Sequence, residues 1–168
     1  MLKSHELLGF MSPDLANDIL NYAFESDKPT YKAVLNGIAE ARKVRPVFLE
    51  RQARPQRHGL MVSTLSRPGL DQVASSLIRA WLVKRQKAML VDFLGALGIA
   101  NNEGVVDDLP ATVDDAQLKA AVEKILATHP PEVVAVYLNA FNDMNEASWA
   151  NLKTMLEHDS RLQVGGRV

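Results

Sequence analysis

The sequence predicts an all-α protein, an irregular multi-helix bundle, and three observations support this fold class. Apolar residues recur at the three- and four-residue spacing of an amphipathic helix from Leu15 to Leu156, wherever the chain is periodic. Proline stands repeatedly where one helical pattern stops and another starts. Of the 168 residues, 47% are apolar and 23% are charged, which is typical of an ordered globular protein.

Two amphipathic helices are predicted in the N-terminal quarter of the chain. Ser12-Pro13-Asp14 combines an N-cap, a proline at the first helical position and an acid in the first turn. The apolar residues that follow at helical spacing are Leu15, Ile19, Leu20, Ala23 and Phe24. A break over residues 27–30 precedes a second helix, which should end near Val44 and whose apolar face is Tyr31, Val34, Leu35, Ile38 and Ala39.

An Arg-Pro dipeptide occurs three times in the next stretch, at Pro46, Pro55 and Pro68. Proline disfavours the α conformation in the residue before it and is well suited to the first turn of a helix. Each proline is therefore predicted to end one short helix and to open the next. Each arginine then lies between the negative C-terminal end of one helix and the positive N-terminal end of another.

Residues 70–98 predict one long central helix that two helical lobes share. Its apolar positions form two groups, and Lys84-Arg85-Gln86-Lys87 is polar for a whole turn between them. We therefore expect a single all-α domain over residues 1–168, with a basic sublobe over residues 1–83 and an acidic sublobe over residues 88–162. Residues 163–168, which contain Gly165-Gly166, are expected to form a loose tail.

The C-terminal half predicts three further helices after a cap at Gly98. Thr112-Val113-Asp114-Asp115 is predicted to start the first of them as a capping box, with Asp in place of Glu. The valine-rich stretch after Pro131 could form a strand, but its period continues to Met144 and favours a buried helix. One hydrophobic cluster is expected here, made of Phe93, Leu97, Val122, Leu126, Tyr137, Phe141 and Trp149.

Several classes of chemistry are excluded or left without a motif. The chain has no cysteine, so disulfides and thiolate chemistry are excluded. The four histidines do not have metal-ligand spacing, and no nucleotide-binding or hydrolase motif occurs. We predict no metal and no cofactor. The start lacks a signal-peptide core, and the longest nearly apolar run, residues 89–100, is too short to span a bilayer. A soluble, cytoplasmic protein without membrane contact is expected.

The net charge of −1 conceals a strong segregation along the sequence. Residues 40–90 carry eleven Lys and Arg against three Asp and Glu, whereas residues 91–168 carry five against twelve. Such blocks are typical of a protein whose middle binds a polyanion, or of two parts of one fold that attract each other. The near cancellation of the charges favours the second interpretation.

The residues predicted to bind an anion or a partner all lie in the basic middle: Arg45, Arg51, Arg54, Arg57, Arg67, Lys84 and Arg85. The first four arginines should be held together, with Glu40, Glu50, the acidic C-terminal third or an external anion as their counter-charge. We favour an internal partner. The most favoured function is a non-enzymatic interaction or scaffold protein that binds a protein partner or forms a homodimer. Binding of nucleic acid or another polyanion through residues 42–87 is the alternative.

An enzymatic reading ranks third. Six residues separate Arg51 from His58, and three separate Arg54 from His58. This Arg…His spacing resembles that of HEPN-type helical ribonucleases, and the resemblance implies that these residues would act on RNA. Pro55 interrupts the motif, and Gln52 follows the first arginine.

Overall fold

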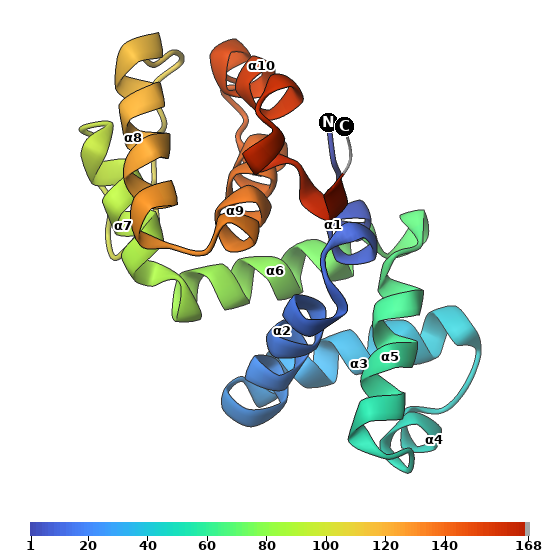
Figure 1. Cartoon of the computed structure of the whole chain (residues 1–168). Coiled ribbons are helices and arrows are strands. Elements are labelled where there is room, and N and C mark those ends of the chain that lie inside the picture. The colour runs from blue at the N-terminus through green and yellow to red at the C-terminus, as the bar shows by residue number, and fades with distance from the viewer. Residues whose placement is uncertain (167–168) are drawn as a thin grey trace. The chain divides into compact units, whose positions relative to one another are not determined.

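The computed structural model describes residues 1–166 and confirms the all-α fold class (Figure 1). Ten α-helices and three short 3-10 helices make up the described chain, and no strand is formed there. The β contact it contains is an isolated bridge between Asn102 and Val105. Within residues 1–166, no helix has the length and apolar content needed to cross a membrane.

The chain divides into two compact units, which are described here separately. The N-terminal unit is Lys3–Trp81; the C-terminal unit begins at Leu82 and includes Met1–Leu2. The division falls inside helix α6 (Asp71–Arg85). The single all-α domain with sublobes over residues 1–83 and 88–162 stays a prediction.

The N-terminal unit is built from short helices whose starts follow the local signals in the sequence. Ser12 caps the second helix, because its Oγ accepts a hydrogen bond of 3.2 Å from the Leu15 N–H. Pro46, Pro55 and Pro68 each stand in the first turn of a new element, as predicted. The elements are α1 (Ser4–Phe10), α2 (Pro13–Ser26), α3 (Lys28–Arg42), α4 (Pro46–Glu50), α5 (Arg54–Leu65) and η1 (Pro68–Leu70), followed by α6.

The core of the N-terminal unit lies where α1, α2 and α3 pack against α5. Most of its fully buried side chains are aliphatic or methionine: Leu7, Leu8, Ile19, Leu20, Ile38, Leu49, Met61 and Leu65. Four polar side chains are buried in the same unit: Ser4, Arg57, His58 and Thr64. Two of these are neighbours on α5, which makes that helix the place where buried charge has to be compensated.

The predicted long helix over residues 70–98 is wrong in its length. Helix α6 ends at Arg85, Gln86 leaves the helical conformation with φ −114° and ψ 23°, and α7 (Lys87–Ala96) starts directly after it. The polar turn 84–87 explains the break, because no apolar side chain there is buried to hold a straight helix together. The new direction lets α7 pack closely along α8.

The C-terminal unit contains α7, α8 (Asp115–Thr128), α9 (Pro131–Met144) and α10 (Ala150–His158), then η2 (Ser160–Leu162) and η3 (Val164–Gly166). Gly98 follows α7 at φ 69°, in the left-handed region that favours glycine at a helix end. Asp114 is the N-cap of α8 and accepts from the Gln117 N–H, so the predicted capping box at Thr112 is displaced by two residues. The stretch after Pro131 is a helix, as expected.

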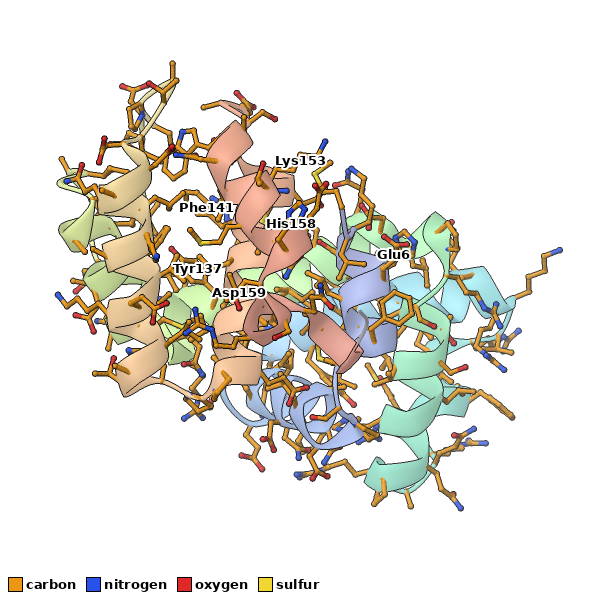
Figure 2. All side chains as sticks on the ribbon, turned by 45° about the horizontal axis from the view of Figure 1, so that its top comes forward. Glu6, Tyr137, Phe141, Lys153, His158 and Asp159 are labelled. Carbon is orange, nitrogen blue, oxygen red and sulfur yellow. The ribbon has the colours of Figure 1, made fainter. Side chains whose placement is uncertain are left out.

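Ring contacts join the four aromatic members of the predicted hydrophobic cluster, of which Tyr137 and Phe141 are labelled in Figure 2. Phe93 packs edge-on against Tyr137 and against Phe141, with ring centroids 5.6 Å apart in both pairs. Phe141 also contacts Trp149, whose indole N–H donates to the Pro110 carbonyl at 2.8 Å. Phe93, Tyr137 and Trp149 are buried, whereas Phe141 and Leu126 are half-buried.

The predicted loose tail differs from the structure in its first part. Leu162 and Val164 are buried, and Asn139 donates from its amide to the Leu162 carbonyl at 2.9 Å. Val164 therefore packs on the unit, so the predicted tail is not loose at this residue. The last two residues of the predicted tail, 167–168, lie outside the described residues.

Candidate functional site

The connection between α3 and α5 brings the first basic residues together. Helix α3 ends at Lys43, which adopts the left-handed conformation at φ 56°, and Arg45 is the extended N-cap of α4. Arg51 is the C-cap of the same five-residue helix. At 1.5 Å per residue, Arg45 and Arg51 lie about 9 Å apart along the helix axis. Figure 1 shows α4 at this junction, beside the start of α5.

Helix α4 is anchored by one residue and displays two others. Leu49 is fully buried, whereas Val47 is 46% exposed and Phe48 is 57% exposed. We call Arg45, Val47, Phe48 and Arg51 the α4 surface. Both arginines are exposed, and neither forms an ion pair with a described residue. The α4 surface therefore combines an exposed apolar centre with unneutralised positive charge.

The start of α5 carries an arginine that stacks on an aromatic ring. The guanidinium carbon of Arg54 lies 3.9 Å above the centre of the Phe24 ring, within cation–π distance. Its Nη1 lies 3.1 Å from Glu25 Oε1, in an ion pair whose two side chains are 41% and 56% exposed. An exposed pair of this kind is screened by solvent and holds Arg54 only weakly.

The next turn of α5 carries a buried arginine and a buried histidine. Arg57 is 8% exposed, and its Nη1 donates to the Glu50 backbone carbonyl at 3.1 Å. Its guanidinium also lies 5.4 Å from the Phe24 ring centre, yet no described carboxylate pairs with it. The Nε of Arg57 is buried without a hydrogen-bond partner. Its charge is thus met by a carbonyl dipole, the Tyr31 hydroxyl and aromatic faces, without a described carboxylate.

His58 is 1% exposed, and its Nε2 lies 3.0 Å from the Tyr31 hydroxyl. Burial, together with the positive charges of Arg57 and Arg54, lowers the pKa of His58 from 6.5 to about 4. Burial also raises the pKa of Tyr31, although Arg57 acts in the opposite direction. The ring is therefore neutral at pH 7, and the local potential is positive.

The predicted site residues are brought together only in part. Arg54 and Arg57 share the Phe24 ring, and Arg45 and Arg51 share α4, all in the N-terminal unit. Arg67 is exposed at the N-cap of η1. Lys84 and Arg85 are exposed at the end of α6 and belong to the C-terminal unit. The set of seven is thus divided between two units.

The acidic residues predicted to neutralise the arginines are mostly not the groups that contact these arginines in the structure. Arg54 pairs with Glu25 of α2, a residue that the sequence did not single out. Glu50 contributes a backbone carbonyl to Arg57, not its carboxylate. Charge patterning along the chain could not identify Glu25 or Phe24, because α2 meets α5 only in the folded unit. The exposed Phe48 has a signal in the sequence: it is one of two aromatic residues in the basic block, and the other, Trp81, is buried.

The geometry gives the ribonuclease alternative no support. A catalytic histidine must reach the substrate, but His58 is buried and its Nε2 is engaged by Tyr31. Among residues 1–166, no cluster of three or more His, Asp or Glu could hold a metal ion. The arrangement is suited to binding a negatively charged group.

Comparisons of the chain with protein-family models, with curated proteins and with solved structures found no match.

Proposed function

We propose that the protein is a non-enzymatic helical interaction protein that binds an acidic protein partner through the α4 surface. The observation that carries the proposal is the exposure of Phe48, at 57%, between two exposed arginines. A buried phenylalanine would contribute to the core, but Phe48 leaves most of its ring in water. Exposure of this apolar surface is unfavourable in free energy, and contact with a partner would remove it from water.

The charge around Phe48 identifies the chemistry of the partner. Residues 42–67 carry seven Lys and Arg against one acid, Glu50. Aromatic and arginine side chains are the types most often found at the energetic centre of protein interfaces. A segment with an apolar side chain flanked by Asp or Glu would cover Phe48 and pair with Arg45 and Arg51.

A peptide library tests this proposal directly. Random peptides are selected on the immobilised full-length protein, and we expect enrichment of sequences that place Asp or Glu beside an apolar anchor. Phe48→Ser and the double variant Arg45→Gln, Arg51→Gln should each weaken an enriched peptide at least tenfold, which is about 1.4 kcal/mol. Arg79→Gln is the matched control, because Arg79 is an exposed arginine of the same unit on α6.

Two outcomes of the same experiment contradict the proposal. One is selection of peptides without acidic residues. The other is unchanged binding to Phe48→Ser and to the double arginine variant. Self-association that is lost in Phe48→Ser would identify a second copy of the chain as the acidic partner.

Nucleic-acid binding is the second candidate, and the same exposed ring favours it, since a base can stack on Phe48 while Arg45 and Arg51 contact phosphates. Against it, Phe48 is the one exposed aromatic side chain among residues 1–166. Single-strand binding usually uses several stacking rings. Binding to oligo(dT) or oligo(U) that falls steeply with salt, and that Phe48→Ser abolishes, would replace the protein partner with this candidate.

A further inference from the structure

We propose that the N-terminal end of α5, together with Arg51, Arg54 and Arg57, binds a phosphate monoester carried by the protein partner. This inference rests on the proposed function, because the site adjoins the α4 surface and names a group on the same partner. Its elements are a helix start with free N–H groups, a buried arginine without a carboxylate, and two exposed arginines.

The backbone at the start of α5 offers hydrogen-bond donors. The N-cap is Ala53, whose side chain cannot accept a hydrogen bond, and Pro55 has no N–H. The first N–H that bonds within the helix belongs to Arg57, which donates to the Ala53 carbonyl at 2.9 Å. The N–H groups of Arg54 and Gln56 come before it and are left for solvent or a ligand. Helix α5 has 12 residues, so its dipole adds to the attraction of an anion.

The buried arginine is the independent sign that an anion belongs here. The Arg57 side chain runs back towards the helix start, because its Nη1 reaches the Glu50 carbonyl in the α4–α5 connection. A guanidinium cannot lose its proton, and a buried charge without a counter-charge is costly. No described carboxylate pairs with Arg57, and its Nε lacks a partner. An anion at the helix start would compensate this charge across a short distance of low polarity.

The exposed arginines provide the accessible contacts. Arg51 stands at the C-cap of α4, three residues before α5, and it has no described ion pair. Arg54 is held flat on Phe24 and is 41% exposed, so it can exchange its solvent-screened Glu25 partner for a ligand oxygen. Donors from the end of α4, from the first turn of α5 and from the α5 backbone are thus all available within residues 51–57.

Phosphate fits this set of donors better than a carboxylate does. A phosphate monoester presents three terminal oxygens and a charge near −2 at neutral pH, whereas a carboxylate presents two oxygens and a charge of −1. The two exposed guanidinium groups of Arg51 and Arg54 and two backbone N–H groups can reach three phosphate oxygens, and the buried charge of Arg57 favours the more highly charged anion. In a phosphorylated partner, Phe48 would cover an apolar side chain near the phosphorylated residue. The α4 surface and the α5 start would then bind one segment together.

Calorimetric titration of the full-length protein tests the site. The probes are one acidic peptide from the library selection in its unphosphorylated form, the same peptide with a phosphoserine beside its apolar anchor, and inorganic phosphate, at one ionic strength. We expect the phosphoserine peptide to bind at least tenfold more tightly than its unphosphorylated form. Arg51→Gln and Arg54→Gln should remove this gain, and Arg79→Gln should keep it. Inorganic phosphate should compete with the phosphoserine peptide.

The results separate this inference from the docking proposal. Equal affinity for both peptides, with Phe48 still required, overturns the phosphate site and leaves the α4 surface in place. A gain from phosphate that survives in Arg51→Gln and Arg54→Gln also overturns the site. Inorganic phosphate that binds through these arginines, while no acidic peptide binds, would support the anion site and refute the docking proposal. Arg51 and Arg54 are exposed, so these variants are expected to fold.

Discussion

Arg57 in the N-terminal unit and Arg161 in the C-terminal unit show two opposite ways in which this chain places a guanidinium group. Arg161 is exposed and donates to two carboxylates, Glu123 at 2.6 Å and Asp159 at 2.7 Å. Its hydrogen bonds lower the pKa of Glu123 and of Asp159. Arg57 is buried and has a carbonyl and aromatic rings in place of an acid. The charge of Arg161 is satisfied by carboxylates within the chain, whereas no described carboxylate pairs with Arg57.

The cores of the two units also differ in how their buried polar atoms are hydrogen-bonded. The C-terminal unit has a chain of aromatic contacts whose indole N–H is satisfied by the Pro110 carbonyl. The N-terminal unit buries Arg57 and His58 on one helix and leaves an atom of each without a partner. Unpartnered buried polar atoms lower stability and are tolerated where function requires them. In the C-terminal unit the buried Asn145 Nδ2 also lacks a partner, but within residues 1–166 only on α5 do two neighbouring residues each leave such an atom, which supports the proposal that the α4–α5 region binds a ligand.

The largest expected effect is the loss of the central ring of the C-terminal core. Phe93→Ala should lower the free energy of unfolding by about 3–5 kcal/mol, because Phe93 is fully buried and contacts both Tyr137 and Phe141. Urea denaturation measures this change. Val91→Ala, at an exposed position on the same helix, is the control and should cost less than about 0.5 kcal/mol. A loss below about 1 kcal/mol for Phe93→Ala would refute the assignment of this core.

The second effect is the acid sensitivity of the N-terminal unit. The unfolded chain protonates His58 near pH 6.5, whereas the folded chain resists protonation until about pH 4, so the unfolded state binds more protons between these values. Stability from this residue is therefore lost as the pH falls from 6.5 to 4, by about 3 kcal/mol. Denaturation midpoints at several pH values should show a slope that His58→Gln flattens.

An exposed histidine is the matched control for this pH dependence. His158 is exposed on α10, and His158→Gln should keep the wild-type slope. If His58→Gln and the wild-type protein lost stability in parallel between pH 6.5 and 4, His58 would not be buried as a neutral ring beside Arg57 and Arg54.

The smallest effect concerns the satisfied arginine. Arg161→Gln should cost no more than about 1 kcal/mol, because exposed ion pairs contribute little to stability and are screened by salt. Thermal unfolding at low and high salt checks this expectation, since the difference from the wild type should shrink with added salt. A loss of several kcal/mol in the free energy of unfolding that added salt does not reduce would contradict the description of the Arg161 ion pairs as exposed and screened.

The helices could be predicted from the sequence because their starts are local. Ser12, Pro46 and Pro131 fix helix beginnings through contacts within one turn, and apolar spacing identifies the faces that are buried. The break at Gln86 is not predicted because apolar periodicity resumes on both sides of the polar turn, and periodicity alone does not show that the helix bends there.

The site could be predicted only as a segment. The arginine-rich segment around Pro46 and Pro55 identified Arg51, Arg54 and Arg57, but which arginine is buried depends on Phe24 and Tyr31, which come from α2 and α3. The exposure of Phe48 also depends on tertiary packing, because α4 is too short for its apolar residues to show which of them is buried. Leu49 and Phe48 are adjacent, and the structure buries the first and exposes the second.

The most direct test of the central claim is an amide NMR titration of the ¹⁵N-labelled full-length protein with the phosphoserine peptide. We predict that the largest shift changes fall on residues 48–57, including the N–H groups of Arg54 and Gln56, which should move downfield as they donate to the phosphate. In Arg54→Gln these changes should weaken, whereas in Arg79→Gln they should persist. Changes centred outside residues 45–57, or none at a peptide concentration that saturates binding by calorimetry, would contradict the claim that the α4–α5 region is the binding site.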